Sequence, residues 1–285
     1  MESTIDIICP LYNAEKYIEK LHRNIRKQQN VEINSINYVL TKGTDNTENI
    51  LKDLDCNYEV IEKNEFSHST VRENMARKCN GDILVFITQD IIVERGDWLE
   101  NLTKGIANGE CHAAYSRQTC SNNTIEKYTR ERNYPEKSFI VSKDDIEKKG
   151  LQAFFFSDAS SAIKRDIFME LNCYDGKKFP TNEDMYIAYK LVTNGYKIKY
   201  CADSVVEHSH KFKLKQLYNR YYDTGVFFKQ NDYLNKYKVN QAGGGMAVYV
   251  LKRAIQDKNF AVIVQFIPNM AARFIGMKMG KFNGK

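Results

Sequence analysis

The sequence predicts an α/β protein with a mostly parallel sheet, flanking helices and a helical C-terminal region. Short apolar runs typical of buried strands alternate with stretches of helical spacing over residues 1–110, which indicates βαβ units. Polar clusters follow two apolar runs, at Thr88-Gln89-Asp90 and Glu207-His208-Ser209-His210, and a third, Asn182-Glu183-Asp184, opens a helix-like stretch. Open sheets of this class carry their ligand groups at such strand ends and helix starts.

The elements of the first half follow from apolar runs and the residues that end them. Pro10 ends the first strand, and Gly81 separates a helix from the fourth strand. The predicted order is strand 5–9, helix 14–28, strand 36–40, helix 47–53, strand 58–62, helix 71–78 and strand 83–87.

The second half has a weaker pattern. Between 111 and 155 polar segments carry scattered aromatic residues, and we expect an irregular region there. The predicted elements that follow are an ordered unit from 157 to 163, a helix over 165–171, a helix from Asn182 to Gly195, a strand over 197–201, helices beyond His210 and a linker at 241–245.

Composition excludes several classes of protein. The 285 residues suffice for one large α/β domain, and 42% hydrophobic residues exclude a disordered chain. Seven cysteines without a C-x-x-C pair predict free thiols in a reducing cytosol. The N-terminus lacks the pattern of a signal peptide, and the absence of a run of about 18 apolar residues predicts no transmembrane helix.

The formal net charge of +6 is concentrated near the C-terminus. Residues 246–285 contain seven basic residues and one acid, Asp257, so this segment alone carries +6. Such a basic, apolar-rich segment suggests a nucleic acid or an anionic membrane as partner, although an ordinary solvated helical face has the same composition.

Asp90, His208 and the pair Glu183-Asp184 suit metal and acid–base chemistry. Asp90 follows a strand, where its carboxylate could hold Mg²⁺ against substrate phosphates. His208 as a nitrogen ligand would favour Mn²⁺. Within the pair Glu183-Asp184, one carboxylate is a candidate general base, and the other could bind a substrate hydroxyl or brace the loop.

The segment 66–72 combines His68 and Arg72 with two hydroxyl residues before a helix. Backbone N–H groups and a guanidinium together suit phosphate oxygens. Arg117-Gln118 is a further polar pair, which an exposed surface would also explain.

With these residues in place, the chain resembles the inverting glycosyltransferases of family 2, which have the GT-A fold. It is most similar to the bacterial rhamnosyltransferase branch that uses dTDP-L-rhamnose. The matching segments, in chain order, are Cys9-Pro10-Leu11-Tyr12-Asn13, Phe66-Ser67-His68 with Arg72, Thr88-Gln89-Asp90, Arg117-Gln118, Asn133-Tyr134-Pro135, Phe156-Ser157-Asp158 with Ser161-Ala162, Glu183-Asp184, Val206-Glu207-His208-Ser209-His210 and Arg220-Tyr221-Tyr222-Asp223-Thr224-Gly225.

The resemblance implies a division of the chain and a role for each candidate residue. Residues 1–210 would form the GT-A catalytic domain, with a nucleotide-sugar half (1–110) and an acceptor half (111–210), and 211–285 a helical, basic, membrane-associated region. Asp184 would be the catalytic base, and Asp90 and His208 would bind Mn²⁺ or Mg²⁺. Donor contacts would come from Pro10, Tyr12, Asn13, Thr41, His68, Arg72, Gln89 and Asp90, and acceptor contacts from Arg117, Gln118, Ser157, Asp158 and Glu183.

Two segments depart from the family pattern. Leu40 and Thr41 stand where the family commonly has carboxylates that bind the nucleotide, so base recognition would shift to Thr41 or to backbone groups. Thr88 replaces the first acid of the D-x-D metal motif.

The resemblance also implies partners. The donor would be dTDP-β-L-rhamnose, and the acceptor a polyprenyl-diphosphate-linked glycan of a cell wall, capsule or O-antigen, at the inner face of the cell membrane. Pro268 and the shortness of the apolar runs favour a tail that lies in the membrane interface. The alternatives are a UDP-hexose donor, a non-catalytic glycan-binding protein and a nucleic-acid-binding protein, for which no recognised motif is present; a homo-oligomer is possible in each case.

Overall fold

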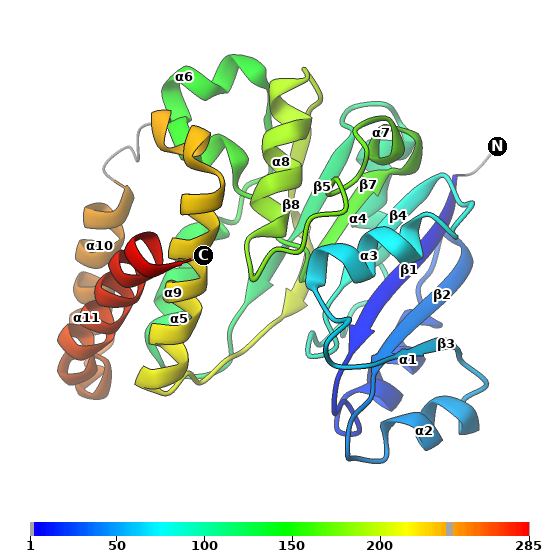
Figure 1. Ribbon diagram of the computed structural model, residues 1–285, viewed down its shortest axis with the longest axis horizontal. Coiled ribbons are helices and arrows are strands. Elements are labelled where there is room, and N and C mark those ends of the chain that lie inside the picture. The colour runs from blue at the N-terminus through cyan, green and yellow to red at the C-terminus, as the bar shows by residue number, and fades with distance from the viewer. Residues whose placement is uncertain (1–2, 238–241, 285) are drawn as a thin grey trace.

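The computed structural model describes residues 3–237 and 242–284, with the backbone alone for 242–244 (Figure 1). One eight-stranded sheet runs in the order β3-β2-β1-β4-β7-β5-β8-β6. Its strands are β1 (Thr4–Leu11), β2 (Glu32–Thr41), β3 (Asn57–Ile61), β4 (Ile83–Ile87), β5 (Ala113–Thr119), β6 (Phe139–Val141), β7 (Ser160–Lys164) and β8 (Ile198–Glu207). Strand β7 is antiparallel to β4 and β5, β6 is antiparallel to β8, and the other pairs are parallel, which confirms the predicted fold class.

Helices cover both faces of the sheet. They are α1 (Ile18–Ile25), α2 (Thr47–Asp53), α3 (His68–Ala76), α4 (Trp98–Ala107), α5 (Ile125–Asn133), α6 (Ile146–Lys149), α7 (Arg165–Glu170), α8 (Glu183–Thr193), α9 (Leu214–Gln230), α10 (Ala242–Gln256) and α11 (Phe260–Asn283), with 3₁₀ turns at Lys143–Asp145, Gly150–Phe154 and Asp232–Lys236. Apolar side chains of α1, α2 and α4 pack into one core cluster, and those of α3, α7, α8 and α9 pack into another.

The expectation of an irregular region at 111–155 is wrong, because β5 lies inside the sheet and α5 follows it. The strand reads Ala-Ala-Tyr-Ser-Arg-Gln-Thr, without an apolar run. Its buried Ser116 hydroxyl lies 2.6 Å from that of Ser160 and 2.8 Å from that of Ser204, and accepts a hydrogen bond from the Trp98 indole. A hydrogen-bonded polar interior of this kind has no hydrophobic periodicity to detect.

Strand β8 joins two predicted apolar runs into one irregular strand. Ser116 of β5 pairs with Cys201 of β8, but the next residue, Arg117, pairs with Val205, so β8 carries a bulge at this point. Beyond the bulge, Glu207 exchanges backbone hydrogen bonds with Ile92, in the loop after β4. This contact brings the ends of β4 and β8 together, although two strands separate them in the sheet.

The C-terminal helices form a separate layer beside the sheet (Figure 1). Helices α9 and α11 approach closely, since a Cβ atom on Gly280 would lie 1.9 Å from the Tyr222 carbonyl oxygen. Helix α10 packs on α5 through a small third core cluster. The predicted linker is wrong for 242–245, where α10 begins, and Gln241 lies outside the described residues.

The C-terminal tail was expected to contain only short apolar runs interrupted at Pro268, but the structure shows one long helix there, α11. It continues for 24 residues through Pro268, and by length and composition it could cross a membrane. Only 11% of its most apolar stretch is buried in the protein. Length and composition do not separate a spanning helix from one that lies on a surface.

Candidate active site

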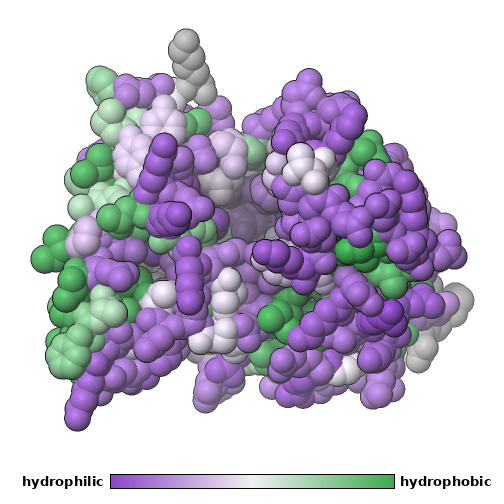
Figure 2. Space-filling view, turned by 90° about the horizontal axis from the view of Figure 1, so that it is seen from below, coloured by the Kyte–Doolittle hydropathy of each residue, from purple (hydrophilic) through white to green (hydrophobic). Residues whose placement is uncertain are grey.

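The predicted polar clusters meet at one edge of the sheet, where they line a cavity of about 450 Å³. We call it the sheet-edge cavity. Figure 2 looks onto this edge and shows a hollow between the two halves of the molecule. The predicted site residues that line the cavity are Pro10, Tyr12, His68, Arg72, Gln89, Asp90, Ser157, Asp158, Glu183, Asp184 and His208.

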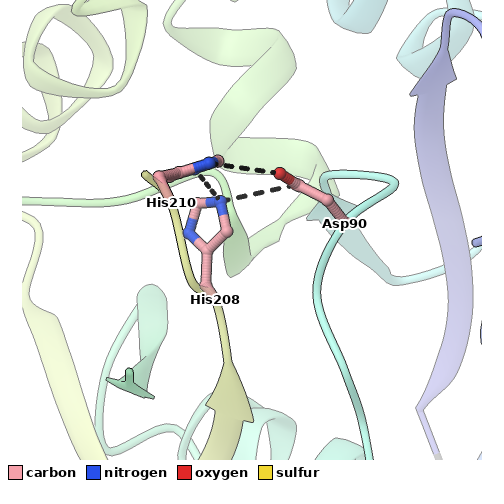
Figure 3. A group of neighbouring side chains, drawn as sticks. All are labelled: Asp90, His208 and His210. Carbon is pink, nitrogen blue, oxygen red and sulfur yellow. Dashed lines mark hydrogen bonds and ion pairs between the residues drawn. The ribbon is translucent and has the colours of Figure 1, made fainter. Parts of the chain in front are cut away.

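Asp90, His208 and His210 form a cluster of potential metal ligands (Figure 3). A carboxylate oxygen of Asp90 lies 3.4 Å from Nε2 of His208, another lies 3.6 Å from Nδ1 of His210, and the two imidazoles approach to 2.7 Å. The possible ligand atoms all lie within 4.8 Å of one another. Sequence reasoning did not assign His210, although a residue two positions beyond His208 in an extended segment projects to the same side.

The charge states of the cluster suit a metal. Burial lowers the pKa of His208, and it lowers the pKa of His210 to about 4. Burial by itself would raise the pKa of Asp90, but the hydrogen bond with His208 and the neighbouring imidazoles hold it below its usual range. At neutral pH the imidazoles are therefore neutral and the carboxylate is ionised, which is the state that metal binding requires.

Gln118 supports the ring of His208. Its Nε2 donates to the Ser157 hydroxyl at 2.7 Å, so its Oε1 faces Nδ1 of His208 at 3.0 Å and also accepts from Arg130, whose guanidinium lies 3.4 Å from the same Nδ1. With its proton on Nδ1 and donated to Gln118, His208 would offer the lone pair of Nε2 to a metal ion in place of the contact with Asp90. One carboxylate and two imidazoles held in this way fit a divalent ion such as Mn²⁺, which accepts nitrogen as well as oxygen ligands.

Arg72, Asp158 and Glu183 form a buried ionic group in the wall of the sheet-edge cavity. The Arg72 guanidinium donates to Glu183 at 2.5 Å and to the Asp158 carbonyl at 3.2 Å. The carboxylate of Asp158 accepts from Ser161 at 2.7 Å and Tyr174 at 2.8 Å. We predicted substrate contacts for Arg72, Asp158 and Glu183, but these side chains form ion pairs and hydrogen bonds mainly with other groups of the protein. A direct contact with substrate stays a prediction.

Asp184 is the least stabilised acid of the site. Burial raises its pKa well above the usual range, and the charges of Glu183 and Asp158 raise it further. Its one hydrogen bond that the structure shows is accepted from the Met185 backbone at 2.8 Å. A carboxylate with a raised pKa is a better proton acceptor at neutral pH than an ordinary one.

A second cavity, of about 260 Å³, adjoins the first and shares with it the lining residues Ser157, Asn182, Asp184, His208, His210 and Arg220. Its walls come mainly from α5, α9 and the segment 154–157, with Arg273 of α11, and we call it the helix-walled cavity. Arg273 pairs there with Glu126 at 2.9 Å and donates to the Tyr221 hydroxyl at 2.5 Å. Asp184 lines both cavities, so it could exchange a proton with a group in one while facing the other.

The remaining predicted residues lie around these cavities. Gln89 pairs with the backbone of Tyr12 through two hydrogen bonds, of 2.7 and 3.0 Å, which join the ends of β4 and β1. Asn13 accepts from the Thr44 backbone at 3.0 Å, and the Thr41 hydroxyl is buried without a partner among the described residues. Arg117 pairs with Glu136 at 3.1 Å and, within the described chain, lines neither cavity.

A mostly parallel sheet with an antiparallel β7 and polar side chains at the ends of its strands fits the GT-A fold expected from the sequence. The sequence profile of glycosyl transferase family 2 matches residues 6–171, and the chain belongs to this family. It is a glycosyltransferase.

Two curated relatives are each 31% identical to the chain. The O-antigen chain rhamnosyltransferase RfbN of Salmonella typhimurium matches over 97% of this chain and 89% of its own length. The O-antigen chain rhamnosyltransferase WbaN of Salmonella anatum matches over 96% and 88%. Among solved structures, the mannosyltransferase PcManGT of Pyrobaculum calidifontis, in complex with GDP-mannose and Mn²⁺, superposes with a TM-score of 0.62 and 17% identity over 99% of this chain and 87% of its own.

Proposed function

We propose that this glycosyltransferase transfers L-rhamnose from dTDP-β-L-rhamnose to a hydroxyl of a lipid-linked glycan, with inversion at the anomeric carbon. The observation that carries the reaction type is the position of Asp184 between two cavities. The rhamnosyl donor is supported by the similarity to two O-antigen chain rhamnosyltransferases along nearly the whole chain.

The donor would occupy the sheet-edge cavity and the acceptor the helix-walled cavity. An acceptor hydroxyl would attack the anomeric carbon and give its proton to Asp184, while the bond to the diphosphate breaks and its electron pair leaves with the diphosphate. A single displacement needs one base and inverts the centre, so a β-linked donor would give an α-rhamnoside.

Asp90, His208 and His210 would hold Mn²⁺ or Mg²⁺, which when bound neutralises charge on the donor diphosphate. The similarity in fold to a mannosyltransferase solved with Mn²⁺ supports this assignment. Tyr12, Gln89 and His68 remain candidate donor contacts in the same cavity. Asn13, which follows β1, and Thr41, which ends β2, remain candidate contacts with the nucleoside.

The function would be carried out at the inner face of the cell membrane, with the outer face of α11 on the bilayer. Phe260, Val264, Ile267, Phe274 and Phe282 recur at helical spacing on one face of α11, and each is 65–81% exposed. Figure 2 shows apolar side chains along the edge of the molecule where α10 and α11 lie in Figure 1. Residues 258–285 contain five basic residues and no acid, which complements an anionic bilayer.

The test of the function is donor turnover with purified protein. It would be incubated with dTDP-L-rhamnose or UDP-sugars, an acceptor-lipid extract, and Mn²⁺ or EDTA, and released nucleoside diphosphate would be measured. We expect dTDP release that needs metal and disappears in Asp184→Asn. Release from a UDP-sugar alone would mean that the donor is a UDP-sugar. This outcome is worth testing because Leu40 and Thr41 stand where the family commonly has carboxylates that bind the nucleotide. No release from any donor would favour a non-catalytic glycan-binding protein.

Attachment to the membrane has a separate test, flotation with vesicles that contain anionic lipid. We expect the wild type to float and the double variant Ile267→Ser with Phe274→Ser to stay at the bottom. Val60→Ser is the matched control, because Val60 is also exposed but lies on β3, at the far edge of the sheet. Flotation of the double variant at the wild-type level would contradict the assignment of this face.

A further inference from the structure

Arg220 in α9 is an exposed arginine that lines both cavities. Among the residues that the structure describes, no carboxylate lies within ion-pair distance of its guanidinium, whereas Arg72 pairs with Glu183 and Arg273 pairs with Glu126. Burial raises the pKa of Asp223, one turn further along α9, and the charge of Arg220 offsets part of this rise without forming an ion pair. The positive charge of Arg220 is therefore available to a ligand.

An aromatic stack holds Arg220 beside the candidate metal cluster. Its guanidinium lies 5.7 Å from the centroid of the Phe212 ring, within the range of a cation–π contact. The Phe212 ring in turn lies 5.0 Å from the ring of His210, at an interplanar angle of 33°. Phe212 thus spaces the guanidinium from the cluster and limits where it can move.

The expected charges of the metal ion and the donor diphosphate do not cancel, and a further cation in the sheet-edge cavity could balance them. Two arginines line this cavity, and Arg72 is already matched by buried carboxylates. A divalent ion on Asp90 and two neutral imidazoles carries a net charge of about +1, and a sugar-linked diphosphate carries about −2. One further positive charge would balance the metal ion and the diphosphate taken together, and Arg220 is the arginine in the wall of the sheet-edge cavity that has no carboxylate partner among the described residues.

We propose that Arg220 binds the diphosphate of the donor beside the Asp90–His208–His210 cluster. The inference rests on the proposed function, since it assumes a nucleotide-sugar donor. As the bond between the anomeric carbon and the diphosphate oxygen breaks, its electron pair stays on that oxygen and the diphosphate gains negative charge. A guanidinium offers paired N–H donors to such oxygens, so Arg220 stabilises the leaving group while Asp184 takes the proton of the acceptor.

The experiment compares two nucleotides that differ by one phosphate. Binding of dTDP and of dTMP would be measured by calorimetry, with Mn²⁺, for the wild type, Arg220→Gln, Arg220→Lys and Lys215→Gln. Loss of a charge-assisted contact is expected to weaken dTDP binding about 10- to 100-fold in Arg220→Gln and to leave dTMP binding within about twofold. Arg220→Lys should lie between, because it keeps the charge and loses the paired donors.

Lys215→Gln is the control, since Lys215 is an exposed cation of the same helix that lines neither cavity. Phe212→Leu should reproduce part of the loss in dTDP affinity without changing the net charge, because it removes the support of the guanidinium.

The outcomes separate this inference from the proposed function. Equal dTDP affinity in the wild type and Arg220→Gln overturns the inference and leaves the function intact, as does an equal loss of dTDP and dTMP binding. Binding of UDP in place of dTDP, with the same selective loss in Arg220→Gln, upholds the role of Arg220 and changes the donor. A wild type that binds no nucleoside diphosphate in the presence of Mn²⁺ overturns both.

Discussion

The two cavities that meet at Asp184 are built from different parts of the chain. The sheet-edge cavity takes its polar groups from the ends of β1, β4 and β8 and the start of α8, whereas the helix-walled cavity is lined mainly by α5, α9 and the segment 154–157, with Arg273 of α11. The first contains a cluster of potential metal ligands, and the second contains an ion pair between two helices. The sheet positions one substrate, and packing of helices shapes the space for the other.

The difference explains how one fold can keep its donor chemistry while its acceptor changes. Strand ends are fixed by the hydrogen bonds of the sheet, but the wall formed by α9 and α11 depends on side chains that can be exchanged without disturbing the sheet. Substitutions should therefore act on donor and acceptor separately, except at residues that line both cavities, such as Asp184, His208 and Arg220.

Asp184→Asn has the largest expected effect on activity. Because the residue lines both cavities, transfer should fall by about 10²–10⁴-fold, the usual contribution of a general base, while dTDP binding changes little. Steady-state turnover and calorimetry on the same protein give the two quantities. Weakened dTDP binding of the same size would instead place Asp184 in donor recognition.

The same variant should be more stable than the wild type at neutral pH. The pKa of Asp184 is raised in the folded protein, so ionisation costs folding free energy at every pH above the unfolded pKa. The gain in melting temperature should vanish when the pH falls below the unfolded pKa, where both states are protonated. Each kcal/mol gained in the free energy of unfolding raises the melting temperature by about 2–4 °C in a domain of 150–250 residues.

Activity should respond to pH in the opposite sense to stability. A base works only when ionised, so turnover should fall about tenfold for each pH unit below the raised pKa of Asp184 and level off above it. A pH profile of turnover at saturating donor and Mn²⁺ measures this. A midpoint near the usual pKa of an aspartate would mean that the buried acids around Asp184 do not shape its chemistry.

The sequence predicts much more of the sheet-edge cavity than of the helix-walled cavity. Strand β4, Asp90, Glu183-Asp184 and His208 were predictable because apolar runs locate strands and polar residues at their ends locate ligands. Their meeting in space was expected from the parallel sheet and is confirmed for the sheet-edge cavity.

The helix-walled cavity could not be predicted from the same signals. Its position depends on β5, whose buried Ser116, bonded to serines of β7 and β8, interrupts the apolar pattern, and on the close approach of α9 and α11 at Gly280. Pairs such as Arg273 with Glu126 lie 147 positions apart in the sequence, and only the packed helices reveal them.

Gln118→Leu distinguishes a support of the metal site from an acceptor contact. The structure places Gln118 behind His208, so loss of this partner should lower affinity for Mn²⁺ about 10- to 100-fold and leave the KM for the acceptor unchanged. Titration of activity with Mn²⁺, at several acceptor concentrations, separates the two. A rise in acceptor KM at saturating Mn²⁺ would support the acceptor contact predicted from the sequence, since Gln118 also lines the helix-walled cavity.

Arg273→Gln tests the helix-walled cavity alone. Removing the partner of Glu126 leaves a partly buried carboxylate unpaired and frees the Tyr221 hydroxyl, which should raise acceptor KM about tenfold with the donor KM unchanged. Glu126→Gln should have a similar effect, because it breaks the same pair from α5. An equal change in donor KM would mean that the two cavities are not independent.

The smallest effect is expected on the outer face of α11, which belongs to neither cavity. Lys278 is exposed on the same helix as Phe274 and Phe282, so Lys278→Gln should weaken binding to anionic vesicles about fivefold, the equivalent of about 1 kcal/mol for one basic residue near an anionic surface. Binding to neutral vesicles should not change. Lys20→Gln, an exposed cation of α1, provides the charge-matched control. An equal loss in both variants would assign the attraction to net charge, and the apolar face of α11 would then have no part in orienting the helix-walled cavity towards a lipid-linked acceptor.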